Sequence, residues 1–220
     1  MKNNLLIFIA LIAIGFTSCD LGNDPEIGGT ATQEVNGEYF VRLFSEPGGA
    51  LYIDYTLTTI SNTSANTTDK IRINDNHNIW GYNGEFNVNL SNKTFSGDRV
   101  PNADYDAAPD PLAFDPIGTR DTVGSDYPKY MTITDGVIIS DAVTAPSAAT
   151  TDSIAFYATG HYYFDIYEVT GHTADTVSTD PLEINFYNIY NFVGEEADGD
   201  PDGPYFLSGY QRTGFLEDEH

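Results

Sequence analysis

The sequence has little of several features on which other proteins depend. Cys19 is the only cysteine among 220 residues, which excludes an internal disulfide and a metal site built from cysteines. Nine lysines and arginines face 33 aspartates and glutamates, and the net charge is −24. Such a surface repels phosphate backbones and anionic head groups, so nucleic-acid binding and electrostatic docking to a membrane are both disfavoured. The acidity serves either general solubility or the capture of cations or basic partners.

Familiar catalytic motifs are also missing. The chain contains no Gly-x-Ser-x-Gly nucleophile elbow and no His-Glu-x-x-His pair, and no glycine-rich loop of the kind that cradles phosphate. These absences exclude an α/β-hydrolase, a zinc protease of the common type and a nucleotide-binding P-loop. No stretch of useful length shows helical periodicity. We therefore assign no catalytic residue from the sequence.

The amino-terminal end resembles a lipoprotein signal. Lys2 precedes an apolar run from Leu5 to Phe16, which is too short to span a bilayer comfortably, and the stretch Phe16-Thr17-Ser18-Cys19 resembles a lipobox. We expect residues 1–18 to be a signal peptide removed during secretion. Cys19 would then carry the lipid chains that attach the protein to the outer membrane or cell surface. A plain secreted protein with an idle cysteine is the alternative.

After Cys19 the composition changes twice. Residues 19–36 are rich in Gly, Asp, Thr and Glu and predict a lipidated, flexible tether. Residues 37–216 then predict one domain of ordinary size for an all-β fold. Within it, residues 97–127 hold several prolines and many aspartates. This acidic insertion is long for a loop and predicts either a functional lid or a surface insertion without a role.

Apolar residues recur with a period of two through most of the domain. Tyr39, Val41 and Leu43 alternate with polar or outward-facing positions, as expected for strands with one buried face. Asn83-Gly84 and Asp135-Gly136 predict tight hairpin turns, because both dipeptides tolerate positive φ. Asn92-Lys93 predicts another turn, with Leu90 opposite Phe95. Further strands are expected at 51–58, 70–74, 130–134, 137–140, 153–159, 162–169, 182–192 and 205–215.

About nine short strands joined mainly by hairpins indicate an all-β fold. An antiparallel meander closed into a β-barrel is the fold class that we expect, because closure removes the exposed strand edges. A β-sandwich is the alternative, since the pattern along the chain does not report which strands become neighbours.

Four segments together resemble a known family: the lipobox, Gly37-Glu38-Tyr39-Phe40-Val41, Leu90-Ser91-Asn92-Lys93-Thr94-Phe95, and Gly209-Tyr210-Gln211-Arg212-Thr213-Gly214-Phe215. The chain is similar over most of its length after Cys19 to the Bacteroidetes family labelled lipid-binding putative hydrolases. The resemblance implies a lipocalin-like barrel that binds lipid. The word hydrolase in the label brings no catalytic residues that can be carried over.

The same resemblance suggests how the barrel closes. Lipocalin-like barrels often place Gly-x-Trp on the first strand, with an arginine from the last strand over the ring. Here Gly37-Glu38-Tyr39 and Arg212 occupy those places, with Tyr in place of Trp. A guanidinium over an aromatic ring contributes about 0.5–2 kcal/mol. We expect Tyr39 and Arg212 to have a structural role at the seam.

Candidate binding residues come from the aromatic strands. His161, Tyr163 and Asp165 would share one strand face and form a polar patch at a barrel mouth, or else a row facing solvent. Trp80, the only tryptophan, is a further candidate for an aromatic pocket wall. The 28 tyrosines and phenylalanines line either a ligand pocket or a packed core.

One acidic stretch has the spacing of a calcium loop. Asp198, Asp200 and Asp202 alternate ahead of Gly203, as in the first half of such a loop, and calcium favours carboxylate oxygens. The twelfth position is Gly209 where a glutamate is expected, so a solvated acidic turn is the alternative. Calcium is the only cofactor that the sequence suggests.

Together these observations predict a membrane-anchored lipoprotein whose barrel binds a small hydrophobic or amphipathic, lipid-like ligand. One alternative is a hydrolase that uses carboxylates such as Asp165. The other is a non-catalytic accessory or adhesion subunit that binds another envelope protein.

Overall fold

The computed structural model describes residues 29–112, 115–177, 180–216 and 219. The predicted signal peptide, Cys19 and most of the predicted tether lie outside these residues. Within the described chain, no helix has both the length and the apolar character needed to cross a membrane.

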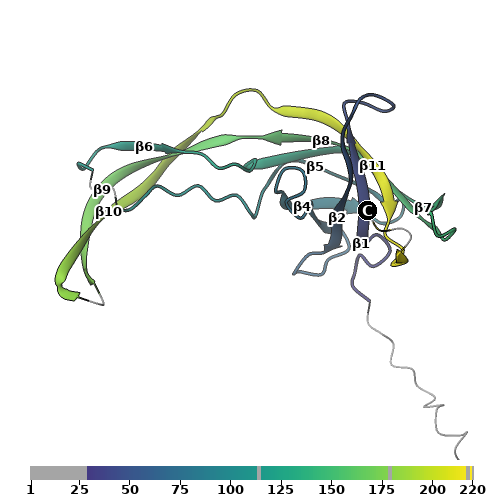
Figure 1. Ribbon diagram of the computed structural model, residues 1–220, viewed down its shortest axis with the longest axis horizontal. Coiled ribbons are helices and arrows are strands. Elements are labelled where there is room, and N and C mark those ends of the chain that lie inside the picture. The colour runs from purple at the N-terminus through teal and green to yellow at the C-terminus, as the bar shows by residue number, and fades with distance from the viewer. Residues whose placement is uncertain (1–28, 113–114, 178–179, 217–218, 220) are drawn as a thin grey trace, which may run out of the picture. The chain divides into compact units, whose positions relative to one another are not determined.

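The described residues form eleven strands (Figure 1). Their bounds are β1 Gly37–Phe44, β2 Leu51–Asn62, β3 Lys70–Asn74, β4 Asn83–Asn89, β5 Thr94–Pro101, β6 Arg120–Val123, β7 Tyr130–Thr144, β8 Thr150–His161, β9 Tyr163–Val177, β10 Asp180–Ala197 and β11 Asp202–Gln211.

Eight of these strands close into an antiparallel barrel in the order β1-β11-β8-β7-β5-β4-β3-β2. This confirms the predicted barrel and rules out the sandwich. The seam joins the first and last strands of the domain, with Tyr39 opposite Gln211 and Phe44 opposite Phe206. Gly209 permits this close approach, because a Cβ there would lie 1.8 Å from the carbonyl oxygen of Phe40.

The predicted alternation becomes the barrel core. Tyr39, Val41 and Leu43 are each at most 5% exposed and point into the same cluster as the inward residues of the other barrel strands. Val35, within the predicted tether 19–36, is 1% exposed and also packs in this cluster, so contact with the barrel begins before Gly37. The Tyr39 hydroxyl donates a hydrogen bond to the Val35 carbonyl at 3.3 Å.

The hairpin turn expected at Asn83-Gly84 is wrong. Both residues belong to β4 and pair with Asn74 and Ile73 of β3. Glycine is needed at position 84 for packing, because a Cβ there would lie 1.8 Å from the Tyr82 hydroxyl oxygen. The connection between β3 and β4 is instead the loop 75–82.

Asp135-Gly136 is likewise not a hairpin turn. The two residues lie inside β7, where the register with β8 shifts between Thr134 and Val137. Asp135 has the positive φ of 52° that the dipeptide predicted, but in a β-bulge. The turn before β5 does include Lys93, with φ 51°, although Val88 rather than Leu90 lies opposite Phe95.

The other three strands form a second sheet, in the order β10-β9-β6, which we call the side sheet. β6 comes from the predicted insertion 97–127. Much of the remaining insertion lies against β9 and β10: Tyr105 and Tyr167 donate hydrogen bonds to the carbonyls of Tyr163 and Ala107, and Asn188 N donates one to Pro111 O. The long insertion is therefore largely ordered against the side sheet.

Candidate ligand-binding site

The interior of the barrel is packed with side chains. Large residues from several strands, among them Tyr39, Phe86 and Ile154, are at most 2% exposed. The internal cavity beside Thr58, Ile73 and Phe156 has a volume of about 20 Å³. A void of that size is comparable to one water molecule and far below the volume of a small-molecule pocket. A lipid-like ligand therefore has no room inside the barrel.

A larger hollow lies at the mouth of the barrel, where β1 ends, β2 begins, β8 ends and β11 begins. Its volume is about 290 Å³. We call it the mouth groove; its walls are Leu43, Tyr52, Ile53, Ile79, Trp80, Tyr162, Asp202 and Tyr205. Seven of these eight residues are apolar or aromatic, which is the usual composition of a pocket for an apolar or amphipathic molecule.

The position of Trp80 in the groove is fixed by Asp75. The Asp75 carboxylate, in a residue 5% exposed, accepts hydrogen bonds from the backbone N–H groups of His77, Trp80 and Tyr82 at 3.0, 2.7 and 2.8 Å. These three bonds hold the loop 75–82 in place. Asn76 and His77 adopt positive φ here, as the tight loop requires.

Asp202 joins two of the aromatic walls. Its Oδ2 accepts a hydrogen bond from Trp80 Nε1 at 3.1 Å, and its Oδ1 accepts one from the Tyr205 hydroxyl at 2.8 Å. The hydrogen bond to Asp202 raises the pKa of Tyr205. Asp202 therefore serves the groove, whereas the sequence suggested calcium at Asp198, Asp200 and Asp202. The described residues contain no group of three or more His, Cys, Asp or Glu side chains placed to hold a metal ion.

Two of the sequence candidates lie at the start of β9, where Asp165 meets a lysine and Tyr163 contacts Arg99 and the Tyr130 ring. Lys129 lies just before β7, and its ammonium contacts the carboxylates of Asp165 and Glu195, the latter at 2.8 Å. Burial alone would lower the pKa of Lys129, but the hydrogen bonds to Asp165 and Glu195 raise it above its usual range. We call Lys129, Asp165 and Glu195 the junction cluster, because it joins the barrel to the side sheet.

Aromatic rings enclose the junction cluster. The Lys129 ammonium lies 5.3 Å from the ring centroid of Tyr105 and 5.4 Å from that of Phe192. Arg99 lies 5.0 Å from the rings of both Tyr130 and Tyr163. Burial raises the pKa of Tyr105 to about 12, and the negative charge of Asp165 acts in the same direction. Each cation here is already matched by carboxylates or rings of the protein.

His161 lies beside this cluster but outside it. Its Nε2 is 2.9 Å from the Thr132 hydroxyl oxygen, and burial lowers its pKa, with a further contribution from Arg99. Trp80 belongs to the separate mouth groove. The structure thus divides the four candidate residues between two places.

Comparison with known proteins identifies the family of the chain. Residues 24–216 match the model of a family described as lipid-binding putative hydrolase. The chain belongs to this family. No curated protein matches the sequence at a significant level.

The description of the lipid-binding putative hydrolase family includes hydrolysis, and Asp165 of the junction cluster is the carboxylate that the sequence suggested for it. Asp165 is 7% exposed, and its carboxylate accepts a hydrogen bond from Lys129. A carboxylate that is buried and bound to an ammonium is poorly placed to take a proton from a substrate. The geometry of the junction cluster is that of a clamp between two sheets.

The seam residues of this family member contact different partners from those expected. Arg212 Nη1 lies 2.6 Å from Glu38 Oε2, and Arg212 N donates a hydrogen bond to Glu38 O. The cation–π contacts among the described residues involve Arg42, Arg99 and Lys129, and not Arg212 with Tyr39. Arg212 therefore binds the first strand through Glu38, while Tyr39 is buried.

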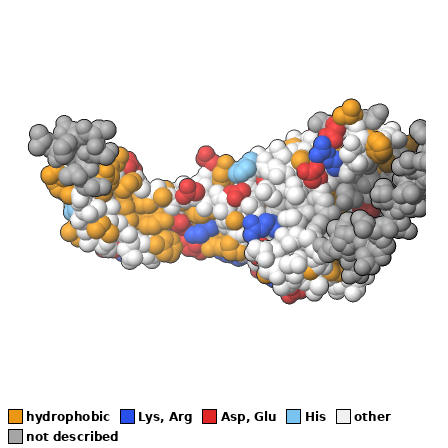
Figure 2. Space-filling model, turned by 90° about the horizontal axis from the view of Figure 1, so that it is seen from below, with side chains coloured by type: hydrophobic (Ala, Val, Ile, Leu, Met, Phe, Trp, Pro, Cys, Tyr) orange, Lys and Arg blue, Asp and Glu red, His pale blue; other side chains and the backbone are white. Residues whose placement is uncertain are grey.

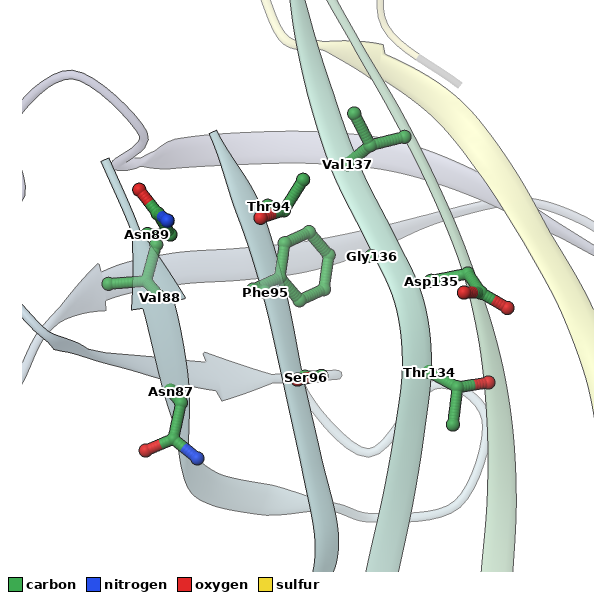
Figure 3. A pocket seen from close by; sticks show the side chains of 10 residues that line it. All are labelled: Asn87, Val88, Asn89, Thr94, Phe95, Ser96, Thr134, Asp135, Gly136 and Val137. Carbon is green, nitrogen blue, oxygen red and sulfur yellow. The ribbon is translucent and has the colours of Figure 1, made fainter. Parts of the chain in front are cut away.

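A second hollow on the barrel wall, of about 650 Å³, has a different character (Figure 3). It lies over β4, β5 and β7, and the polar side chains that line it are Asn87, Asn89, Thr94, Ser96, Thr134 and Asp135. Two of its apolar residues, Val88 and Phe95, are buried in the core. Six of its ten residues carry polar side chains, whereas seven of the eight residues of the mouth groove are apolar or aromatic, and we take the mouth groove as the candidate site.

Apolar side chains are also exposed on the side sheet (Figure 2). Twelve large apolar residues of the described chain are exposed, and seven lie on β10 or on the insertion that packs against the side sheet: Leu112, Ile117, Ile184, Phe186, Ile189, Phe192 and Val193. Exposed apolar side chains that gather on one part of a protein often mark an interaction site.

Proposed function

We propose that the protein binds a small amphipathic, lipid-like ligand in the mouth groove, at the end of the barrel rather than inside it. The observation that carries this proposal is the contrast between a lumen cavity of about 20 Å³ and an aromatic groove of about 290 Å³. Membership of a family described as lipid-binding supports the same ligand class. The apolar part of the ligand would lie on Leu43, Ile53 and Ile79, with the aromatic rings around the rest.

Trp80 provides a direct test, because it is the only tryptophan and forms part of the groove. A ligand that enters the groove changes its fluorescence. Tyr52→Ala removes one wall of the groove, whose side chain is 59% exposed, without opening the core. We expect it to weaken binding at least about tenfold, as for a central aromatic contact. Leu51→Ala is the matched control, since Leu51 is also exposed on β2 but does not form part of the groove.

The outcome separates a groove ligand from other modes of binding. If amphiphiles bind the full chain and Tyr52→Ala binds them as well as Leu51→Ala does, the mouth groove is not the site. If organic extracts of protein purified without detergent hold no amphiphile and none binds on titration, the ligand-binding function itself is refuted.

The proposal includes attachment to the cell envelope through lipid on Cys19, after removal of residues 1–18. The lipobox supports it, and the net charge of −24 leaves covalent lipid as the means of attachment to an anionic membrane. Metabolic labelling with a radioactive fatty acid tests it: we expect label in the wild-type chain and none in Cys19→Ser. A wild-type protein that stays unlabelled and water-soluble refutes the anchor. The surface of the outer membrane of a Bacteroidetes cell is the location that we propose.

A second function, as an accessory subunit for another envelope protein, is favoured by the exposed apolar residues of the side sheet. A photo-crosslinking amino acid at Phe186, 54% exposed, tests it in cells. We expect one discrete crosslinked product there and none from Ile139, which is 55% exposed on β7 of the barrel. Equal crosslinking from both positions would refute a specific partner surface.

A further inference from the structure

The residues of the mouth groove are arranged so that they could enclose a positively charged group. Four aromatic rings and one carboxylate surround it: Tyr52, Trp80, Tyr162, Tyr205 and Asp202. Tyr52 and Tyr205 meet edge to face, with ring centroids 5.7 Å apart and planes at 89°. Trp80 and Tyr205 are 6.2 Å apart and closer to parallel, at 35°. Ring faces carry partial negative charge, and aromatic cages with a nearby carboxylate suit quaternary ammonium groups.

No cation of the described residues occupies this cage. Arg42 lies 3.9 Å from the Tyr55 ring, Arg99 lies over Tyr130 and Tyr163, and Lys129 lies among the rings around the junction cluster. None of the cation–π contacts of the described residues involves the four rings of the mouth groove, and no lysine or arginine is among the residues that form it. Five rings elsewhere in the described chain face its own cations, and the four rings of the mouth groove, which lie together beside a carboxylate, do not.

The negative charges in and around the groove also favour a positively charged ligand. Asp202 lies within it, and Asp75, buried beneath the loop that carries Trp80, also forms part of the adjoining internal cavity. Burial raises the pKa of the Tyr162 hydroxyl, and the negative charges of Asp202 and Asp75 raise it further. A carboxylate or phosphate head group brought here would meet these charges and the net charge of the whole chain.

The position of Asp202 is held from both sides. Trp80 Nε1 and the Tyr205 hydroxyl donate to its two oxygens, so the carboxylate is fixed between two of the rings rather than free to rotate. A ligand cation can therefore approach the ring faces and the carboxylate together. Pre-organisation of this kind reduces the entropy lost when a ligand binds.

We propose that the mouth groove selects amphiphiles with an alkylammonium head group of the choline type, whose apolar part lies on Leu43, Ile53 and Ile79. This rests on the proposed function, since it names the ligand class for the same groove. The ligand chemistry is a methylated or alkylated ammonium joined to an aliphatic chain.

Three probes of equal chain length test the proposal on the full chain: decyltrimethylammonium, uncharged 1,2-decanediol and anionic decanoate, each below its micelle concentration. Binding is followed by Trp80 fluorescence and calorimetry. We expect decyltrimethylammonium to bind at least tenfold more tightly than 1,2-decanediol, and decanoate to bind most weakly. Tetramethylammonium chloride should compete with decyltrimethylammonium, whereas potassium chloride at equal ionic strength should compete much less.

Variants identify the groups responsible. Asp202→Asn keeps one acceptor oxygen for Trp80 Nε1, and its amide group can donate to the Tyr205 hydroxyl in place of the second bond, while the charge is removed. We expect this variant to lose the preference for the cation and to keep 1,2-decanediol binding. Asp200→Asn is the matched control: it removes the same charge two residues away, outside the groove, and should keep the preference. Should Asp202→Asn not fold, Tyr52→Leu, on an exposed residue, replaces a ring with an aliphatic side chain and should reduce the cation preference.

The possible results are distinct. Equal binding of the three probes, tighter binding of decanoate, or an unchanged preference in both Asp202→Asn and Tyr52→Leu overturns the ammonium cage but leaves the lipid-binding function intact. Failure of all three probes to bind overturns both the cage and the proposed function.

Discussion

The junction cluster makes a quantitative prediction for Lys129→Met. The substitution keeps the aliphatic length of the side chain but removes the ammonium from between Asp165 and Glu195. The side chains of Lys129 and Asp165 are only 16% and 9% exposed, whereas that of Glu195 is 32% exposed and regains water more easily. An uncompensated buried charge costs 3–5 kcal/mol. Since Glu195 can relax toward solvent, we expect the lower end, about 3 kcal/mol.

Chemical unfolding in urea measures this loss, and a thermal scan should show Tm lower by roughly 6–12 °C for a domain of this size. Arg120→Met is the matched control, because Arg120 and Glu168 also pair within the side sheet. Their atoms are 3.8 Å apart and the side chains are 69% and 37% exposed, so this pair should contribute less than about 1 kcal/mol. A second substitution, Asp165→Leu, should recover part of the stability of Lys129→Met, because it removes the unpaired charge.

The pH dependence gives an independent check. The hydrogen bond from Lys129 lowers the pKa of Glu195, so its contribution is present above the unfolded pKa of about 4.3 and is lost as the pH falls through the folded pKa. For Lys129, whose pKa is raised, the contribution is present below about pH 10.4 and is lost at more alkaline pH. If Lys129→Met costs no more than Arg120→Met and leaves the acid limb unchanged, the cluster does not clamp the two sheets.

Three further substitutions test the packing. Gly209→Ala should destabilise the seam by about 3 kcal/mol or more, because a Cβ would lie 1.8 Å from a backbone oxygen, while Gly194→Ala, with open space around it, should change the free energy of unfolding by less than about 0.5 kcal/mol. Asp75→Ala should cost at least about 2 kcal/mol in urea unfolding, since three backbone donors lose their acceptor, and it should shift the Trp80 emission. Thr58→Val should leave stability unchanged or raise it by up to about 1 kcal/mol, because the buried Thr58 hydroxyl has no partner among the described residues; a loss above 1 kcal/mol would contradict this.

Alternation along the chain was sufficient to predict an all-β fold, and the barrel was preferred to a sandwich because closure removes the exposed strand edges. Residues such as Tyr39, Val41 and Leu43 repeat with the period of a strand. A strand with one apolar face must bury that face against other strands. The turn signals were less informative. Asp135-Gly136 permits positive φ, which suits a hairpin turn and a bulge equally, and long-range pairing with β8 decides between them. Gly84 reflects the position of the Tyr82 ring, which no local pattern reports.

The candidate site was predicted only in part. Trp80 stood out as the only tryptophan, and Asp202 was singled out for calcium, whereas its hydrogen bonds to Trp80 and Tyr205 were not foreseen. The separation of 122 residues between Trp80 and Asp202 explains why no spacing rule could bring them together. Lys129 gave no signal at all, because its partners lie on two strands of a sheet whose existence the sequence did not indicate.

Strands β9 and β10 of the side sheet lie in the connection between the barrel strands β8 and β11. β8 and β11 already pair within the barrel, with Gly160 opposite Asp202, and Asp198 N donates to Tyr162 O. The strands β9 and β10 are thus an excursion between two neighbours that a short turn would connect equally well. Removal or exchange of this excursion leaves every hydrogen-bonded barrel pair in place, so the pairing of the barrel sets no requirement on the length or sequence of these two strands.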